Sequence, residues 1–269
     1  MTANPLSRAD RGTIAAILSE HLQAPVALEV WLRQESALLR TDRDRCVHCS
    51  ETLALARHVA ALHPGLSVTR YDLDQHEQRA REAGIERAPT TVLRAGGRSV
   101  RFAGLWTGAL LPAFLDGVLF VAAGKTPLTD QTRAALASLP ADAPPFSIEA
   151  LVAPYDGYSP GLMRMVFALG AESQRLRVQV TEVAEFPLLA AMRGVARLPV
   201  VIIGGRRYEG AWEEGELVEQ LRRIATGDEA PVIRPRLPST PFMTDEQLAA
   251  ASGEREQPRT PGGLLLPGR

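Results

Sequence analysis

The sequence predicts an α/β protein built from two similar units in tandem, each with a mixed central sheet flanked by helices. Helical and strand-like periodicities alternate along the chain, and landmarks of the first half return 110 residues later. The length of 269 residues and the hydrophobic content of 45% suit two domains of a little over a hundred residues each, followed by an end segment.

The first unit opens with a helix followed by a strand. Apolar residues first recur at helical spacing, at Ile14, Ile17, Leu18 and Leu22. They then alternate as in a strand, at Val26, Leu28, Val30 and Leu32. A second helix is expected to run from Cys46 to about Leu62, because Pro64 and Gly65 would stop it there.

The rest of the first unit reads as strand, short helix, strand and hairpin. A strand is expected from Leu66. Asp74 and Glu77 form a capping pair at the start of a short helix, and Gly84 suits its C-terminal cap. A strand through Val92 and a glycine turn complete the unit.

The second unit repeats this skeleton without the sulfur atoms. The offset of 110 residues carries Gly84 to Gly194 and Pro89 to Pro199, and it carries the two cysteines to Asp156 and Ser159. So many coincident landmarks indicate a duplicated domain. We predict one domain over residues 1–126, with the cysteines, and a second over residues 127–228, with a degenerate site.

The segment from residue 229 to residue 269 breaks the pattern. It is rich in proline, glycine and small polar residues, a composition that rarely buries a core. Disorder is therefore expected there, with one short helix that Thr244 and Gln247 could open.

Together these motifs resemble a known family. The order strand, CxxC, helix, strand, helix, Ala-Pro, strand, hairpin, helix resembles the thioredoxin fold. Its duplication is similar to the glutaredoxin-like protein disulfide oxidoreductases of archaea and some bacteria, and the plan of the N-terminal region of alkyl hydroperoxide reductase flavoprotein is similar too. The match is close around IERAPTTVL, whereas APYDGYSPG in the second unit resembles APxCPYCPG without its cysteines.

The spacing of the cysteines predicts their roles. A cysteine at the start of a helix points its sulfur at free backbone N–H groups and the positive end of the helix dipole, which favours the thiolate. Cys46 is that residue. Cys49 would lie one turn deeper, where it can attack a mixed disulfide on Cys46. His48 between them is a third candidate catalytic residue, because the sequence resembles the CGHC motif of disulfide isomerases.

Candidate substrate-binding residues come from two places. The resemblance implies a cis bond at Ala88-Pro89, which would offer the Ala88 backbone to an extended peptide. About ten extra residues precede Cys46 when the two units are compared, and they lead to the hypothesis that Arg40, Arg43 and Arg45 surround the site. In the second unit, Pro199 would accompany the degenerate pair.

Other chemistries are less well supported. His58 and His63 have finger-like spacing relative to the cysteines, but a zinc site would break the helix that carries them, so no metal is expected. An inert structural thiol pair is a further alternative. Ser159 has no histidine in its own unit to activate it, since all five histidines lie at or before His76.

Three function classes follow. The chain could be a protein disulfide oxidoreductase, an electron carrier from a reductase to a peroxiredoxin, or a protein-binding module whose redox chemistry is incidental. No flavin or nicotinamide motif accompanies the cysteines, so no cofactor is expected and electrons would come from a separate thioredoxin-reductase-like protein. A net charge of −1 and the absence of basic runs disfavour nucleic acid and membrane surfaces. The cytoplasm is the expected location.

Overall fold

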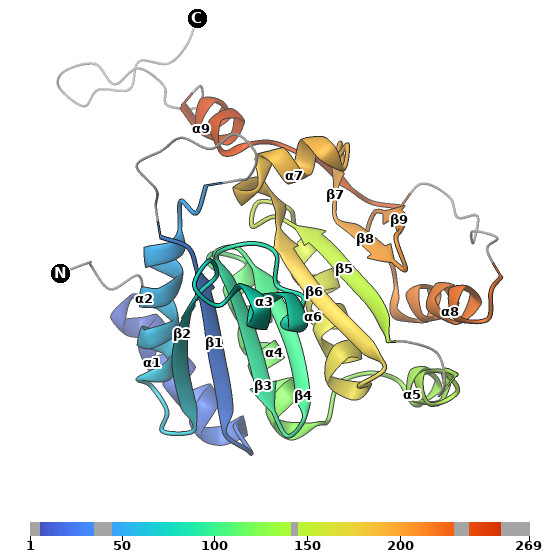
Figure 1. The fold of residues 1–269 in the computed structure, drawn as a ribbon, viewed down its shortest axis with the longest axis horizontal. Coiled ribbons are helices and arrows are strands. Elements are labelled where there is room, and N and C mark those ends of the chain that lie inside the picture. Colours follow the sequence, from blue (N-terminus) through green and yellow to red (C-terminus); the bar gives the residue numbers. More distant parts are fainter. Residues whose placement is uncertain (1–5, 35–44, 141–144, 229–236, 254–269) are drawn as a thin grey trace, which may run out of the picture.

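The computed structural model describes residues 6–34, 45–140, 145–228 and 237–253, which form alternating helices and strands (Figure 1). The helices are α1 (Arg8–His21), α2 (Cys49–Ala60), α3 (Glu77–Ala83), α4 (Leu110–Ala123), α5 (Asp130–Ala137), α6 (Ser159–Glu172), the 3-10 turn η1 (Val183–Glu185), α7 (Pro187–Met192), α8 (Glu214–Ala225) and α9 (Asp245–Gly253). The strands are β1 (Val26–Leu32), β2 (Leu66–Asp72), β3 (Thr90–Ala95), β4 (Arg98–Ala103), β5 (Phe146–Val152), β6 (Leu176–Glu182), β7 (Arg197–Leu198), β8 (Val200–Ile203), β9 (Arg206–Glu209) and β10 (Thr240–Pro241).

Eight of these strands form one continuous sheet, in the order β2-β1-β3-β4-β6-β5-β8-β9. Each half has the same pairing pattern. In the first half β1 is parallel to β2 and antiparallel to β3, which is antiparallel to β4. In the second half β5 is parallel to β6 and antiparallel to β8, which is antiparallel to β9. The order α2, β2, α3, β3, β4, α4 after β1 recurs as α6, β6, α7, β8, β9, α8 after β5. The predicted fold class, two tandem units with mixed sheets, is therefore confirmed, whereas the domain boundaries remain predictions.

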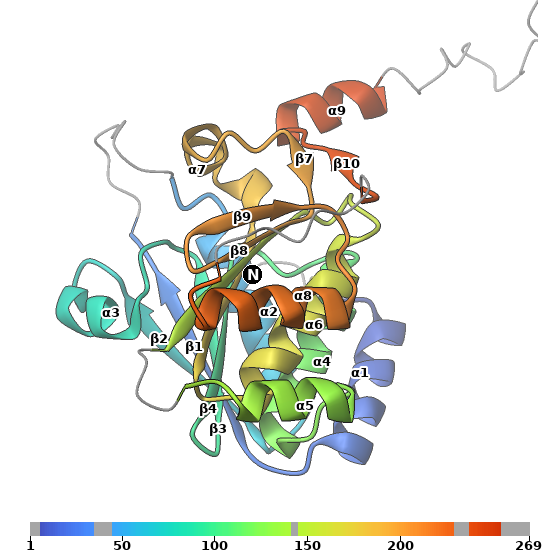
Figure 2. The same ribbon diagram turned by 90° about the vertical axis from the view of Figure 1, so that its right-hand side faces the viewer.

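The helices cover the two faces of the sheet unequally. Figure 2 shows α1, α4 and α6 on one face and α3 on the opposite face. The main core lies between the sheet and α1, α4 and α6. It includes the aromatic side chains of Phe102, Trp106, Phe114 and Phe167. Trp106 and Phe114 stack at 3.9 Å between ring centroids, and the Trp106 Nε1–H donates to Thr91 Oγ1.

The two halves join through a short parallel pairing between β4 and β6, in which Phe102 lies opposite Val180. Behind it α4 packs against α6. Gly117 permits this approach, because a Cβ there would overlap the ring of Phe167. An ion pair between Arg164 and Asp116, 2.5 Å apart, lies at the edge of the same contact.

Residues 237–253 differ from the expectation of disorder. They form β10, which pairs with β7, and α9. The proposed capping pair opens α9, since the Thr244 N–H donates to Gln247 Oε1 and the Gln247 N–H donates to Thr244 Oγ1. Composition could not reveal this order, because the stabilising partners of the segment lie in the second unit.

The start of α3 also differs from the expected capping pair. His76 is the N-cap residue, and no side chain caps the helix there. Asp72 accepts hydrogen bonds from the backbone of Asp74 and Gln75 instead, in the turn before the helix. None of the helices in the described part of the chain has the length and apolar character needed to cross a membrane.

The contact at Gly117 generates a stability prediction. Gly117→Ala should lower the free energy of unfolding by about 1–3 kcal/mol, because the added methyl forces α4 away from Phe167. Gly161→Ala is the matched control, since Gly161 lies in α6 with nothing near its Cβ position, and alanine there should stabilise by about 0.5–1 kcal/mol. Urea unfolding measures both. Equal effects would show that the helices do not pack as described.

Candidate redox site

The two cysteines lie just beyond the C-terminal end of β1 and form a disulfide, with Cα atoms 5.4 Å apart. Helix α2 begins at Cys49, and not at Cys46 as expected from the sequence. His48, the N-cap residue, has φ −106° and ψ 22°, so the helix cannot extend back through it. Cys46 therefore lies in the turn that enters the helix, and Cys49 is the first helical residue.

The disulfide is largely covered. Cys46 is 8% exposed and Cys49 is 9% exposed, whereas Val47 between them is 62% exposed. The backbone N–H of Arg33, the first residue after β1, donates to Cys49 Sγ at 3.3 Å. This contact gives Cys49 a hydrogen-bond donor on its inner side, which would also support a thiolate there.

Charged groups missed by the sequence reasoning surround this turn. Arg33 Nε donates to Asp74 Oδ1 at 3.0 Å, which links the end of β1 to the turn before α3. Glu51, in the first turn of α2, accepts from Ser50 Oγ. A hydrogen bond from its own backbone N–H, the Ser50 hydroxyl and the nearby His48 lower the pKa of Glu51. The only signal in the sequence for Arg33 was its position directly after a strand.

The Ala88–Pro89 peptide bond is cis and lies at the same end of the sheet as the cysteines. Pro89 directly precedes β3, whose first residue Thr90 pairs with Trp31 near the C-terminal end of β1. Ala88 is buried at 4% exposure. The structure thus brings this segment to the same sheet edge as Cys46 and Cys49.

The remaining candidates of the first unit lie around the turn. Arg45 is exposed and His48 is half-buried. The extra segment before Cys46 falls mostly within residues 35–44, so Arg40 and Arg43 lie outside the described residues. The roles of Arg45, His48, Ala88 and Pro89 stay predictions.

In the second unit, a hydrogen bond takes the place of the disulfide. Ser159 Oγ donates to Asp156 Oδ2 at 2.6 Å, and both residues are fully buried. The backbone N–H of Ala153, the first residue after β5, donates to Ser159 Oγ at 3.1 Å, as Arg33 does to Cys49. The Leu198–Pro199 bond is cis. The second unit therefore preserves the geometry of the site without its cysteines.

Metal binding finds no support among the residues described. No group of three or more histidine, cysteine, aspartate or glutamate side chains there could hold an ion. The histidines with finger-like spacing contact nearby backbone instead: His58 Nδ1 lies 2.7 Å from Ala54 O, and His63 Nδ1 accepts from the Gly65 N–H.

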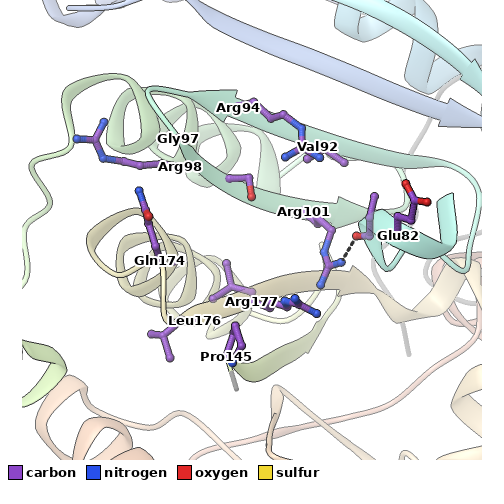
Figure 3. Close-up of a pocket in the computed structure, with 14 residues that line it drawn as sticks. Glu82, Val92, Arg94, Gly97, Arg98, Arg101, Pro145, Gln174, Leu176 and Arg177 are labelled. Atoms are coloured by element: carbon purple, nitrogen blue, oxygen red, sulfur yellow. Dashed lines mark hydrogen bonds between the residues drawn. The ribbon is translucent and has the colours of Figure 1, made fainter. Parts of the chain in front are cut away.

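A hollow of about 320 Å³ lies away from the cysteines, where strands β3 and β4 meet β6 (Figure 3). Figure 3 shows the side chains of Arg101 and Arg177 next to each other in it. Burial and the charge of Arg177 lower the pKa of Arg101. Arg101 donates to the carbonyls of Ala83 and Gly84 at the end of α3.

The second unit repeats this contact. Arg207 donates to the carbonyls of Arg193 and Gly194 after α7. Because the same bond closes the corresponding helix in both units, Arg101 is explained as a helix-capping residue and gives no indication of a ligand in the hollow.

The charges around the turn generate a prediction about redox potential. An imidazolium near Cys46 stabilises its thiolate and hence the reduced form. His48→Ala should therefore raise the pKa of the reduced Cys46 thiol and make the potential more negative by tens of millivolts near pH 7 and low salt, since about 30 mV corresponds to 1.4 kcal/mol. Equilibration with glutathione buffers measures the shift.

The matched variant removes a negative charge at the same helix start. Glu51→Gln should shift the potential in the opposite direction, because the carboxylate opposes a thiolate at the N-terminus of α2. If His48→Ala leaves the potential unchanged while Arg45→Ala shifts it, the arginine sets the thiolate stability and the prediction for His48 is wrong.

Solved structures with the same architecture include one of the alkylhydroperoxide reductase protein AhpF from Enterococcus faecalis, at a TM-score of 0.69 and 18% identity. That match covers 80% of this chain and 99% of the other. A separate structure of the N-terminal domain of AhpF gives the same values. A protein disulfide oxidoreductase from Aeropyrum pernix matches at a TM-score of 0.67 and 22% identity, over 82% of this chain and 94% of the other.

Sequence comparisons find no counterpart: no protein-family model and no curated protein matches the chain. At identities of 18% and 22%, the structural likeness establishes the fold. The chain therefore has the thioredoxin fold in two tandem units, with a CxxC disulfide, Cys46–Cys49, in the first unit and an Asp156–Ser159 pair in its place in the second.

Proposed function

We propose that this chain is a thiol–disulfide oxidoreductase that exchanges disulfides with protein substrates through Cys46 and Cys49. The observation that carries the proposal is the disulfide itself, formed at the end of β1 and the start of α2, at the same sheet edge as the cis Pro89.

The proposed reaction moves two electrons from the cysteine pair to a substrate. The Cys46 thiolate attacks a substrate disulfide, forms a mixed disulfide and releases one substrate thiolate. Cys49, the first residue of α2, then loses its proton and attacks Cys46 Sγ. The second substrate thiolate leaves, and the Cys46–Cys49 disulfide seen in the structure results. The reverse sequence oxidises a substrate dithiol.

Continued turnover needs a second redox partner. A dithiol on a separate, thioredoxin-reductase-like protein would reduce the pair again, because the proposed mechanism contains no flavin or nicotinamide. Ala88 and Pro89 would contact an extended substrate segment, and Arg45 would select among partners. The proposal keeps the cytoplasmic location that the sequence leads us to expect.

A second candidate is an electron carrier from a reductase to a peroxiredoxin. It is favoured by the likeness to the structures of AhpF, over 80% of this chain. The same two cysteines would act, and only the acceptor would differ. Peroxide consumption in a mixture of reductase, this protein and a peroxiredoxin tests it directly. Loss of that activity in Cys46→Ser would assign the transfer to this pair.

The roles of the two cysteines give the principal test. Cys49→Ser should accumulate a mixed disulfide with an oxidised model protein substrate, because Cys46 can attack but nothing resolves the product. Cys46→Ser should form none, since the remaining thiol is the first residue of α2 and is placed to resolve a mixed disulfide on residue 46. Non-reducing electrophoresis and mass spectrometry of the adduct measure both.

Two outcomes would contradict the assignment. Adducts with Cys46→Ser alone would invert the two roles. The absence of adducts with either variant, together with no turnover by the wild-type protein of any protein disulfide or peroxiredoxin, would leave the chain as a binding module whose redox chemistry is incidental.

A further inference from the structure

The chain's own residues 237–243 lie across the second unit as an added strand. Thr240 in β10 pairs antiparallel with Leu198 in β7, and Pro241 lies opposite Arg197. Backbone bonds extend the contact on both sides: the Phe242 N–H donates to Ala196 O at 3.0 Å, and the Ala211 N–H donates to Pro238 O at 2.9 Å. We call these residues the C-terminal strap.

The place where the strap binds is informative. Strand β7 ends directly before the cis Pro199, and the repeat relates Arg197 and Leu198 to Arg87 and Ala88 before the cis Pro89. An unpaired backbone edge at this position can accept an extended peptide as an additional strand. The strap thus occupies, in the second unit, the position at which we place the substrate segment in the first.

Side chains anchor the strap at the degenerate site. Thr240 Oγ1 donates to Asp156 Oδ1 at 2.6 Å, while Asp156 Oδ2 accepts from Ser159. One residue earlier, Arg197 donates from Nε to Ser239 Oγ at 2.7 Å and from Nη2 to Ser239 O at 2.6 Å. Asp156, at the position of Cys46, therefore contacts the strap directly, and Ser159 is linked to it through Asp156.

Two further contacts define the other end. The hydroxyl of Tyr155 accepts from the Met243 N–H at 2.7 Å and donates to Met243 O at 3.1 Å. Phe242 packs against the apolar cluster of the second unit that includes Leu198 and Val200. Gly210 permits the close approach of the strap, because a Cβ there would lie 2.5 Å from that of Leu237.

The burial of Asp156 makes its hydrogen bond to the strap important for stability. Asp156 is fully buried, and a buried carboxylate is costly unless hydrogen bonds satisfy it. Ser159 satisfies one oxygen from within the unit, whereas the strap supplies the donor for the other. Removing the strap would leave that oxygen without its hydroxyl and expose the edge of β7. While the strap is bound, a hydroxyl at this position is therefore preferred to an apolar side chain.

We propose that the second unit is a peptide-binding unit, rebuilt around Asp156, Ser159 and Arg197, and that the C-terminal strap occupies its site in cis. The ligand class is an extended segment in which two successive hydroxyl residues precede a proline and an aromatic residue, as in Ser239-Thr240-Pro241-Phe242. A partner's segment of this class would compete with the strap. The proposal is independent of the redox function, because it involves neither cysteine.

The test uses the full chain and a labelled synthetic peptide of residues 237–250. Thr240→Val removes the hydroxyl while keeping the side-chain shape, and Thr240→Ser is the matched control. Thr240→Val should speed hydrogen exchange at the Phe242 amide about tenfold or more, because the lost bond is to a charged group, and Thr240→Ser should not. The native peptide should bind the Thr240→Val protein at least about tenfold more tightly than it binds the wild-type protein, because the weakened strap competes less well for the site.

Binding must also depend on the peptide's own hydroxyl. Two peptides are compared on the same Thr240→Val protein: the native peptide and one in which valine replaces Thr240. The valine peptide should bind at least tenfold more weakly. Because only the peptide differs, the fold of the protein is the same in both measurements. If Thr240→Val does not fold, Ser239→Ala, which removes the hydroxyl that accepts from Arg197 Nε, takes its place in both arms. Equal binding of the two peptides, or unchanged exchange at Phe242, would overturn the proposal.

Discussion

The pairing of β4 with β6 is the contact on which the arrangement of this molecule depends. Each half has a strand at its edge with unpaired N–H and C=O groups, and an exposed edge is open to pairing with other chains. Joining the two edges satisfies them and creates the eight-stranded sheet. It also requires α4 and α6 to approach closely, which Gly117 allows.

The shared sheet places the two sites at one end of the molecule. Strands β1 and β5 run in the same direction, so the cysteine pair and the Asp156–Ser159 pair both follow the carboxyl ends of their strands (Figure 1). Four strand spacings separate β1 from β5, or roughly 19 Å. The two sites therefore lie at the same end of one sheet.

One backbone arrangement supports two chemistries. In both units, the first N–H after the strand donates to the fourth residue of the motif, which is Cys49 in one and Ser159 in the other. With sulfur, the pair can release two electrons by forming a covalent bond and take them up again when that bond is reduced. With a carboxylate and a hydroxyl, the pair forms hydrogen bonds, and Asp156 accepts one from Thr240 of the C-terminal strap. Duplication thus leaves a redox site and a candidate peptide site on the same scaffold.

Sequence alone determined the alternation of elements, the CxxC motif, the duplication and the equivalence of Pro89 and Pro199, because these depend on periodicity and spacing within short windows. It could not reveal that Arg33 contacts Cys49, that α2 begins only at Cys49, or that β4 pairs with β6. The sequence also did not predict the binding of the strap, because Thr240 lies 84 residues from its partner Asp156. Such contacts join segments that are distant in the sequence, and the packing of the whole chain decides which segments meet. The periodicity of residues within one short segment cannot predict them.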